Sequence, residues 1–153
     1  FTLNNKMNII ATNRKATYEY HILQKYEAGL VLVGTEVKAL REGKANIKES
    51  YIRFIRNELF CIGMHIGEYS HLGYANHNPL RDKKLLMHKY EILKIKSKFE
   101  TKGFAIVPLK LYFKKGKAKI EIALAKGKKK WDKRETIKKR DIDREMKRSM
   151  KGN

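Results

Sequence analysis

The sequence predicts a mainly β fold: a small, closed or nearly closed antiparallel barrel of about six strands, with two or three flanking helices and a basic C-terminal tail. Short apolar segments with the period-2 alternation of half-buried strands recur between turn residues through residues 18–125. Too few helical segments alternate with them for a doubly wound parallel sheet. Because closure removes exposed sheet edges, a barrel is the economical arrangement, and the oligonucleotide-binding type is one such architecture.

The first third of the chain predicts two strands and a short helix. Residues 18–22 alternate apolar and polar side chains, and residues 30–33 form a short apolar run before Gly34. Residues 35–44, TEVKALREGK, have helical spacing, with Thr35 as the expected N-cap and Gly43 as the stop.

A hairpin is predicted next, formed by residues 50–56 and 59–66 around an Asn57–Glu58 turn. In its second arm, alternation predicts one shared face for Phe60, Ile62, Met64 and Ile66.

The last part of the body predicts a helix and a second hairpin. Residues 80–103 have apolar residues at helical spacings and end at Gly103. Residues 104–113 and 117–125 predict two strands joined by Lys115–Gly116, with Pro108 marking an edge or a bulge.

The composition indicates a globular protein that binds a polyanion. Of the 153 residues, 42% are hydrophobic, which is enough for one core, while the formal net charge is +20. Such a charge exceeds what solubility requires and attracts nucleic acid first and an anionic membrane surface second. No segment combines a strong apolar face with a basic one, so the membrane alternative is weak.

Several other classes of protein are disfavoured. No apolar run is long enough to cross a bilayer, and no signal segment opens the chain. Cys61 is the only cysteine, so no disulfide framework or thiolate metal cage is expected, and a cytosolic setting fits. Motifs for phosphate loops, dinucleotide sites, nucleophile elbows and paired metal-binding histidines are absent. We therefore expect no enzyme, cofactor, metal or small-molecule substrate, although scattered carboxylates leave a metal-dependent nuclease open.

Three segments are expected along the chain. Residues 1–12 form an N-terminal extension; its first six, FTLNNK, precede a natural-looking start at Met7 and are expected to be partly foreign to the natural chain. Residues 13–126 form the barrel domain. Residues 127–153 form the tail, and the stretch 126–153 holds 13 Lys and Arg against 5 Asp and Glu.

The tail has helical features that its charge opposes. On a helix, Ile142, Met146 and Met150 form a narrow apolar stripe, and Glu135 lies four residues before Lys139. Clustered lysines and arginines repel one another, and an isolated helix of this length is marginal in water. We expect a tail that is disordered when free and becomes helical when phosphates neutralise it.

Several blocks of the sequence resemble the SmpB family of SsrA-binding proteins. They are residues 27–52 (EAGLVLVGTEVKALREGKANIKESYI), 78–88 (NPLRDKKLLMH), 108–113 (PLKLYF) and 123–140 (ALAKGKKKWDKRETIKKR). The similarity extends from about residue 13 to residue 150, and the pair GTEVKxLR and AKGKKxxDKR in this order is highly specific.

The resemblance implies an RNA-binding partner protein with an oligonucleotide-binding-type barrel. Members bind the tRNA-like domain of transfer-messenger RNA (tmRNA) and deliver it to stalled ribosomes for trans-translation. Their tail enters the small-subunit decoding region and the vacant message channel. The alternative function is a general structural RNA-binding protein, such as a ribosomal or ribosome-assembly protein.

The resemblance also implies site residues. The RNA-binding positions are Glu27, Leu86, Lys119, Lys126, Lys128 and Lys129. The ribosome-binding positions of the tail are Trp131, Asp132, Lys133, Arg134, Lys138, Arg140, Ile142, Met146 and Met150. From the residues alone, Glu27 is a solvated acid, Leu86 is at least as well explained as a core residue of a helix, and Lys119 fits a phosphate contact or a solvated lysine equally.

Overall fold

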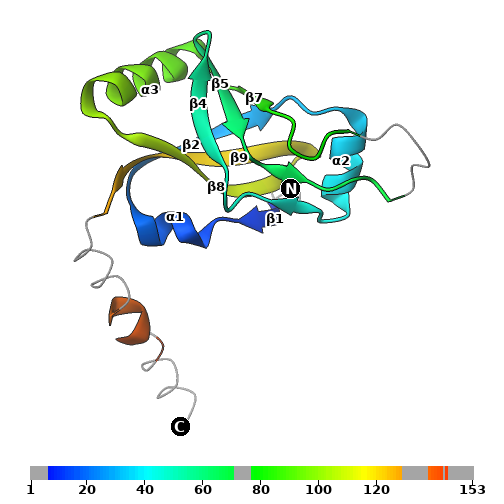
Figure 1. Ribbon diagram of the computed structural model, residues 1–153, viewed down its shortest axis with the longest axis horizontal. Coiled ribbons are helices and arrows are strands. Elements are labelled where there is room, and N and C mark those ends of the chain that lie inside the picture. Colours follow the sequence, from blue (N-terminus) through cyan, green and yellow to red (C-terminus); the bar gives the residue numbers. More distant parts are fainter. Residues whose placement is uncertain (1–6, 71–76, 129–137, 143, 145–153) are drawn as a thin grey trace.

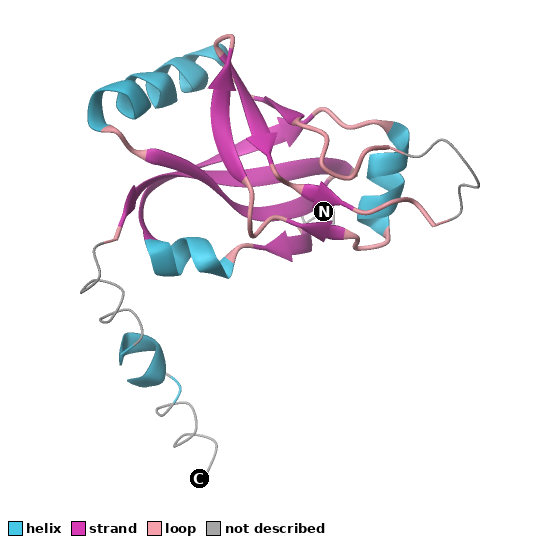
Figure 2. Cartoon of the chain, in the orientation of Figure 1, coloured by secondary structure: helices cyan, strands magenta, loops and turns pink. Residues whose placement is uncertain are grey.

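The computed structural model describes residues 7–70, 77–128, 138–142 and 144. Its elements, shown in Figures 1 and 2, are β1 (Asn8–Thr12), α1 (Arg14–Glu19), β2 (Tyr20–Leu30), α2 (Gly34–Arg41), β3 (Ala45–Asn46), β4 (Tyr51–Ile55), β5 (Glu58–Ile62), β6 (His65–Ile66), β7 (Lys83–Leu86), α3 (Lys89–Lys102), β8 (Ala105–Lys114) and β9 (Lys117–Gly127).

The main sheet has seven strands in the order β1-β8-β9-β2-β7-β5-β4, and every neighbouring pair is antiparallel. A separate two-stranded ribbon pairs β3 with β6. The edge strand β4 also packs close to β8, so the sheet curls back on itself without closing through hydrogen bonds. The mainly β antiparallel fold with flanking helices is confirmed, and the sheet is open rather than a closed barrel.

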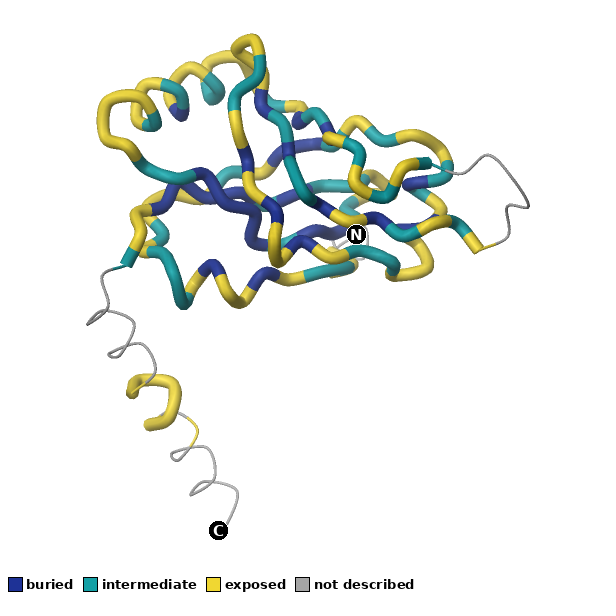
Figure 3. Tube along the Cα trace, in the orientation of Figure 1, coloured by how far each residue is buried: buried dark blue, intermediate teal, exposed yellow. Residues whose placement is uncertain are grey.

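The core lies on the inner face of this curled sheet. Alternate residues of β9 point into this core, and Ile120 and Ile122 are completely buried there. Leu59, Cys61 and Leu85 belong to the same cluster. α3 covers one end of the core with Ile95, and its Phe99 ring lies 5.6 Å from that of Phe54. Figure 1 shows α2 near the opposite end of the sheet, and Figure 3 shows that the buried residues concentrate along the strands.

A smaller core lies on the outer face of the sheet, under α1. Ala16 of α1 packs there against side chains of β8 and β9, namely Val107, Leu109, Ala123 and Ala125. α1 therefore covers one end of the outer face and leaves the other end uncovered.

The prediction of two strands at 18–22 and 30–33 is wrong, because the chain forms one strand of 11 residues, β2, after a short helix. Gln24, Lys25 and Glu27 break the apolar pattern in the middle of this strand. β2 still pairs with β9 along most of its length, with one register irregularity between Ile22 and Gln24. These polar side chains hid the continuity of the strand.

The prediction of one helix over residues 80–103 is also wrong in its first part. Residues 83–86 form β7, with Lys83 and Leu85 buried while Leu86 is 54% exposed. A pair of adjacent leucines fits a helical pattern as well as a strand, and pairing with β2 and β5 decides for the strand. The end at Gly103 is confirmed.

The first hairpin forms with a shifted turn and a different core face. Arg56 and Asn57, with φ of 52° and 65°, occupy the turn in place of Asn57–Glu58. Leu59 and Cys61 point into the core, so Phe60 and Ile62 are on the outer face. Gly63, with φ of +78°, then shifts the alternation, which buries Met64 and Ile66.

Several boundaries follow the sequence closely. The β8–β9 hairpin turns at Lys115–Gly116, and the register shift between Pro108 and Lys110 is the predicted bulge. α2 has Val33 rather than Thr35 as its N-cap residue, and the Glu36 carboxylate accepts the Val33 N–H at 2.9 Å. Residues 8–12 are the strand β1 of the sheet, so this part of the predicted N-terminal extension belongs to the body. No helix among the described residues is long and apolar enough to span a membrane.

Candidate nucleic-acid interface

The uncovered end of the outer face carries one row of residues that crosses four strands in register. Tyr112 of β8 is opposite Lys119 of β9, which is opposite Gly29 of β2, which in turn is opposite Leu86 of β7. We call these four residues the Lys119 row. Their sequence neighbours Leu85, Leu111 and Ile120 are buried in the main core, and strand alternation therefore directs the row to the outer face.

Glu27 adjoins this row, two residues before Gly29 on the same face of β2. The structure thus brings Glu27, Leu86 and Lys119 together, although they come from three strands. Leu86 is exposed and outside both core clusters, which removes its alternative interpretation as a core residue.

Gly29 makes the middle of the row low. A Cβ atom on Gly29 would lie 3.4 Å from the Cβ of Leu86, in ordinary van der Waals contact, so a side chain here would fill the space beside Leu86. Two adjoining hollows, each of about 360 Å³, share Gly29, Leu86 and Lys119. The first, the His88 hollow, is completed by Glu27, Met87, His88 and Glu91. The second, the Val37 hollow, is completed by Leu30, Leu32, Val37, Phe113, Gly116, Lys117 and Ala118.

Glu27 is held as a carboxylate. The Tyr112 hydroxyl donates to its Oε2, and Lys114 Nζ lies 3.4 Å from the same oxygen. The hydrogen bond from Tyr112 is the largest cause of a lowered Glu27 pKa; Lys114 and Lys119 lower it further, and partial burial opposes them. Burial, followed by the bond to Glu27, raises the pKa of Tyr112, so its hydroxyl stays a donor.

A fixed carboxylate on a basic face has a specific use. It repels phosphate, but it accepts hydrogen bonds from ribose hydroxyls and base N–H groups, which distinguish RNA features from the uniform backbone. Lysines around it supply the attraction for the backbone: Lys114, Lys117 and Lys119 come from β8 and β9. The arrangement suits RNA with accessible bases.

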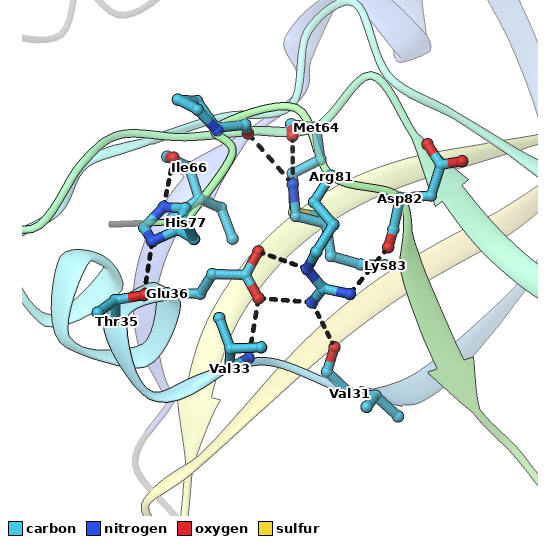
Figure 4. Close-up of polar contacts among 11 residues, drawn as sticks. Val31, Val33, Thr35, Glu36, Met64, Ile66, His77, Arg81, Asp82 and Lys83 are labelled. Carbon is cyan, nitrogen blue, oxygen red and sulfur yellow. Dashed lines mark hydrogen bonds and ion pairs between the residues drawn. The ribbon is translucent and has the colours of Figure 1, made fainter. Parts of the chain in front are cut away.

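A buried polar network positions the strand that carries Leu86 (Figure 4). Glu36 of α2 is completely buried and forms an ion pair with Arg81, whose Nη2 also donates to the Val31 carbonyl at 3.1 Å. The Val31 N–H donates to the Lys84 carbonyl at 3.0 Å. Together these bonds fix the start of β7 against the end of β2, and Leu86 is thereby placed beside Gly29.

Two further residues complete the network. His77 bridges Thr35 Oγ1 at 2.8 Å and the Ile66 carbonyl at 2.9 Å. Lys83 is buried and donates to the carbonyls of Met64, at 2.7 Å, and Pro79, at 3.3 Å. Burial lowers the Lys83 pKa, and the nearby Glu36 opposes that shift.

Cys61 is a core residue. Burial raises the pKa of its thiol to about 12, so it stays protonated. Among the described residues, no three His, Cys, Asp or Glu side chains form a group that could hold a metal ion.

The remaining predicted RNA contacts do not join the Lys119 row. Lys126 is opposite His21 near the other end of β9, seven residues from Lys119, which is roughly 23 Å along a strand. Lys128 donates from Nζ to the Thr17 carbonyl at 3.0 Å and from its N–H to the Glu19 carbonyl at 2.8 Å, so it ties β9 to α1. Lys129 is outside the described residues.

Only part of the predicted tail site is described. Residues 138–142 and 144 are helical, and Lys138, Arg140 and Ile142 are exposed. Arg140 Nη2 donates to Thr17 Oγ1 at 3.2 Å. Trp131, Asp132, Lys133, Arg134, Met146 and Met150 lie outside the described residues.

Sequence reasoning missed the residues that hold the site together. Tyr112 is only 2% exposed and its hydroxyl donates to Glu27, a supporting role that the sequence did not indicate. No role was predicted for His88, yet it lines the His88 hollow. The register of β7 against β2 would have shown that Gly29 lies beside Leu86 and that a hollow forms there. That register could be predicted only if residues 83–86 were assigned as a strand.

Comparisons with known proteins agree with the predicted resemblance. A family model described as SmpB protein matches residues 10–152. An SsrA-binding protein from Syntrophobacter fumaroxidans is 53% identical over 146 residues, covering 95% of this chain and 91% of the relative. Another, from Desulforudis audaxviator, is 53% identical over 143 residues, covering 94% of each chain.

A solved structure described as "tmRNA-SmpB: a journey to the center of the bacterial ribosome" contains a similar chain. The identity is 47% and the TM-score is 0.64, over 78% of this chain and 84% of that one. The match of the family model over most of the sequence, the identity to curated relatives and the shared fold lead to one conclusion: this chain belongs to the SmpB family.

Proposed function

We propose that this protein binds the tRNA-like domain of tmRNA through the Lys119 row and Glu27, and delivers that RNA to stalled ribosomes for trans-translation. The observation that carries the proposal is the in-register assembly of Leu86, Gly29 and Lys119 beside Glu27 on an uncovered sheet face. Relatives at 53% identity are named for binding SsrA, which is this RNA, and a similar chain has been solved in the context of tmRNA and the bacterial ribosome.

The physical basis is a division between attraction and recognition. A net charge of +20 supplies affinity for any polyanion. The tRNA-like fold offers a rigid shape and exposed loop bases, which a hollowed, partly apolar face with a fixed carboxylate can contact. The proposed function is binding rather than catalysis, and a protein that acts on the bacterial ribosome would act in the cytoplasm.

The tail is proposed to serve the second partner, the ribosome. Its basic residues are neutralised in a channel lined by ribosomal RNA, which removes the repulsion that opposes a helix. A message downstream of the decoding region would occupy the same space. Folding of residues 127–153 would therefore report that the message channel is vacant.

Competition binding tests the first partner. Labelled tmRNA is bound to the full chain at moderate salt and challenged with bulk tRNA or with unlabelled tmRNA. We expect tmRNA to compete far more strongly than bulk tRNA. Equal competition by both would instead support a general structural RNA-binding protein.

A composition-preserving scramble of residues 131–150 tests the tail. The scrambled chain keeps its charge, so tmRNA binding should be retained while rescue of stalled ribosomes in a purified translation system is lost. Rescue by the scrambled chain would show that the tail is only a basic anchor.

A further inference from the structure

The His88 hollow differs in charge from the rest of this basic protein. Two carboxylates, Glu27 and Glu91, line it together with one amine, Lys119. Two carboxylates disfavour the entry of a phosphate group, which would be repelled at close range. The hollow is therefore suited to a neutral group that donates hydrogen bonds, which in RNA is a nucleobase or a ribose hydroxyl, and its aromatic wall favours the nucleobase.

One wall of the hollow is aromatic. His88 links β7 to α3 as the N-cap residue of that helix, and it lines the hollow above Leu86 and Gly29. Its ring is stacked on Tyr90, with centroids 5.5 Å apart and planes inclined by 15°. Tyr90 is 61% exposed, Lys94 Nζ lies over its ring at 5.9 Å, and neither aromatic residue belongs to a core cluster.

The remaining surfaces fit the other parts of a base. Leu86, which is 54% exposed, and Gly29 form a low apolar floor. Lys119 and Glu27 come from neighbouring strands and are close enough for Lys119 to lower the Glu27 pKa. Oε2 of Glu27 is occupied by Tyr112 and Lys114, whereas within the described part of the chain Oε1 accepts no hydrogen bond.

We propose that the His88 hollow is a slot for one unstacked guanine of the bound RNA. The base stacks on His88, Lys119 donates to the guanine O6, and the carboxylates of Glu27 and Glu91 accept from N1–H and the N2 amino group. Guanine is the base that presents an acceptor beside two adjacent donors on one edge. Adenine and cytosine each offer one donor group there, and uracil flanks its single N–H with two carbonyl oxygens that the carboxylates repel.

This assignment deepens the proposed function, on which it rests for the identity of the RNA, and it revises one expectation. Lys119 contacts a base oxygen rather than a phosphate. Tyr90 acts as a positioning residue, because it touches His88 and holds the ring parallel to the incoming base.

Short oligoribonucleotides test the slot directly. Fluorescence anisotropy of the full chain is measured with uridine octamers that carry guanosine, inosine, adenosine, cytidine or uridine at one central position. We expect guanosine to bind about fivefold or more tighter than uridine. Inosine, which lacks the N2 amino group, should fall between them. Equal affinity for all five probes would overturn the proposal.

Variants separate stacking from other effects. His88→Ala should weaken the guanosine probe about fivefold or more, whereas His88→Phe should retain binding because the stacking wall remains. Glu27→Gln should abolish the preference for guanosine. Leu93→Ala is the matched control, since Leu93 is 56% exposed on α3 but does not line the hollow. The stacking role is wrong if His88→Ala binds the guanosine probe as tightly as the wild type does. It is also wrong if His88→Phe loses as much affinity as His88→Ala while its melting temperature stays that of the wild type.

The two proposals fail separately. Loss of base preference with continued selection of tmRNA over bulk tRNA would remove only the guanine slot. A guanosine preference without selection of tmRNA would leave the slot and remove the proposed function.

Discussion

Glu27 shows how a single carboxylate can be fixed on a strongly basic surface. It has a tyrosine hydroxyl and a lysine amine on one oxygen, and both favour its ionised form. Its folded pKa lies below the ordinary value of 4.5, so its stabilising contribution is present above about that pH. The contribution is lost as the pH falls through the lowered pKa.

Tyr112→Phe tests this coupling. The variant should lose about 1 kcal/mol of unfolding free energy at pH 7, since a hydrogen bond to a half-exposed carboxylate is removed. The difference from the wild type should narrow as the pH falls below 4.5 and Glu27 takes up a proton in both proteins. Urea unfolding over a pH series measures it.

Tyr26→Phe, one residue before Glu27 on β2, is the matched control. The Tyr26 hydroxyl is buried without a hydrogen-bond partner among the described residues, and its removal should cost nothing. A difference between Tyr112→Phe and the wild type that does not depend on pH would contradict the assigned role of Glu27.

The Glu36–Arg81 ion pair predicts a larger effect. Arg81→Met leaves the fully buried Glu36 carboxylate without its cation and should cost about 3 kcal/mol, near the low end for buried pairs because Arg81 is 36% exposed. Arg41→Met, on the exposed side at the end of α2, should change stability by less than about 0.5 kcal/mol. Thermal unfolding of the two variants compares them, and similar melting temperatures would show that the pair is not stabilising.

At the level of elements, the β8–β9 turn was easier to predict than the strands β2 and β7. Lys115–Gly116 has left-handed φ angles of 53° and 74°, which a tight two-residue hairpin turn requires, and glycine marks it in the sequence. β2 was split because its outer residues are polar, and β7 was read as helix because Leu85 and Leu86 are adjacent. Both errors concern segments whose state is decided by pairing with distant strands, which one sequence does not reveal.

The candidate site was likewise only partly predictable from the sequence. Family resemblance identified Glu27, Leu86 and Lys119, but strand register was needed to show that they are neighbours and that Gly29 lies between two of them. Residue patterns alone explained Leu86 at least as well as a core residue of a helix as they did as an RNA contact. Lys126 and Lys128 were predicted as RNA contacts together with these three residues, while the length of β9 separates them from the Lys119 row.

The β8–β9 turn gives a prediction at this scale. Gly116→Ala should cost about 1 kcal/mol, because no atom lies within 4 Å of the added methyl group and only the left-handed backbone is penalised. Lys115→Asn should be neutral or slightly stabilising, because asparagine tolerates this conformation. Chemical denaturation measures both, and a stabilising alanine would show that the turn adopts another backbone conformation.

For the whole molecule, the charges at the two ends of β9 should act differently on a tRNA-like RNA. Lys117, beside the Lys119 row, and Lys126, near α1, are both exposed. Lys117→Ala should reduce the slope of log affinity against log salt by about 0.7 to 0.9, as expected for one lost phosphate contact. Lys126→Ala should leave the slope for the isolated tRNA-like domain unchanged, and equal changes in both variants would indicate diffuse binding.

The most direct measurement is amide chemical-shift mapping of the full chain by NMR as the isolated tRNA-like domain is added. The Lys119 row, Glu27 and His88 should show the largest shift changes, while α1 and the β4–β5 turn at Arg56 and Asn57 should change little. Shift changes spread evenly over all exposed basic segments, with the outer face near Gly29 unaffected, would contradict the interface described above.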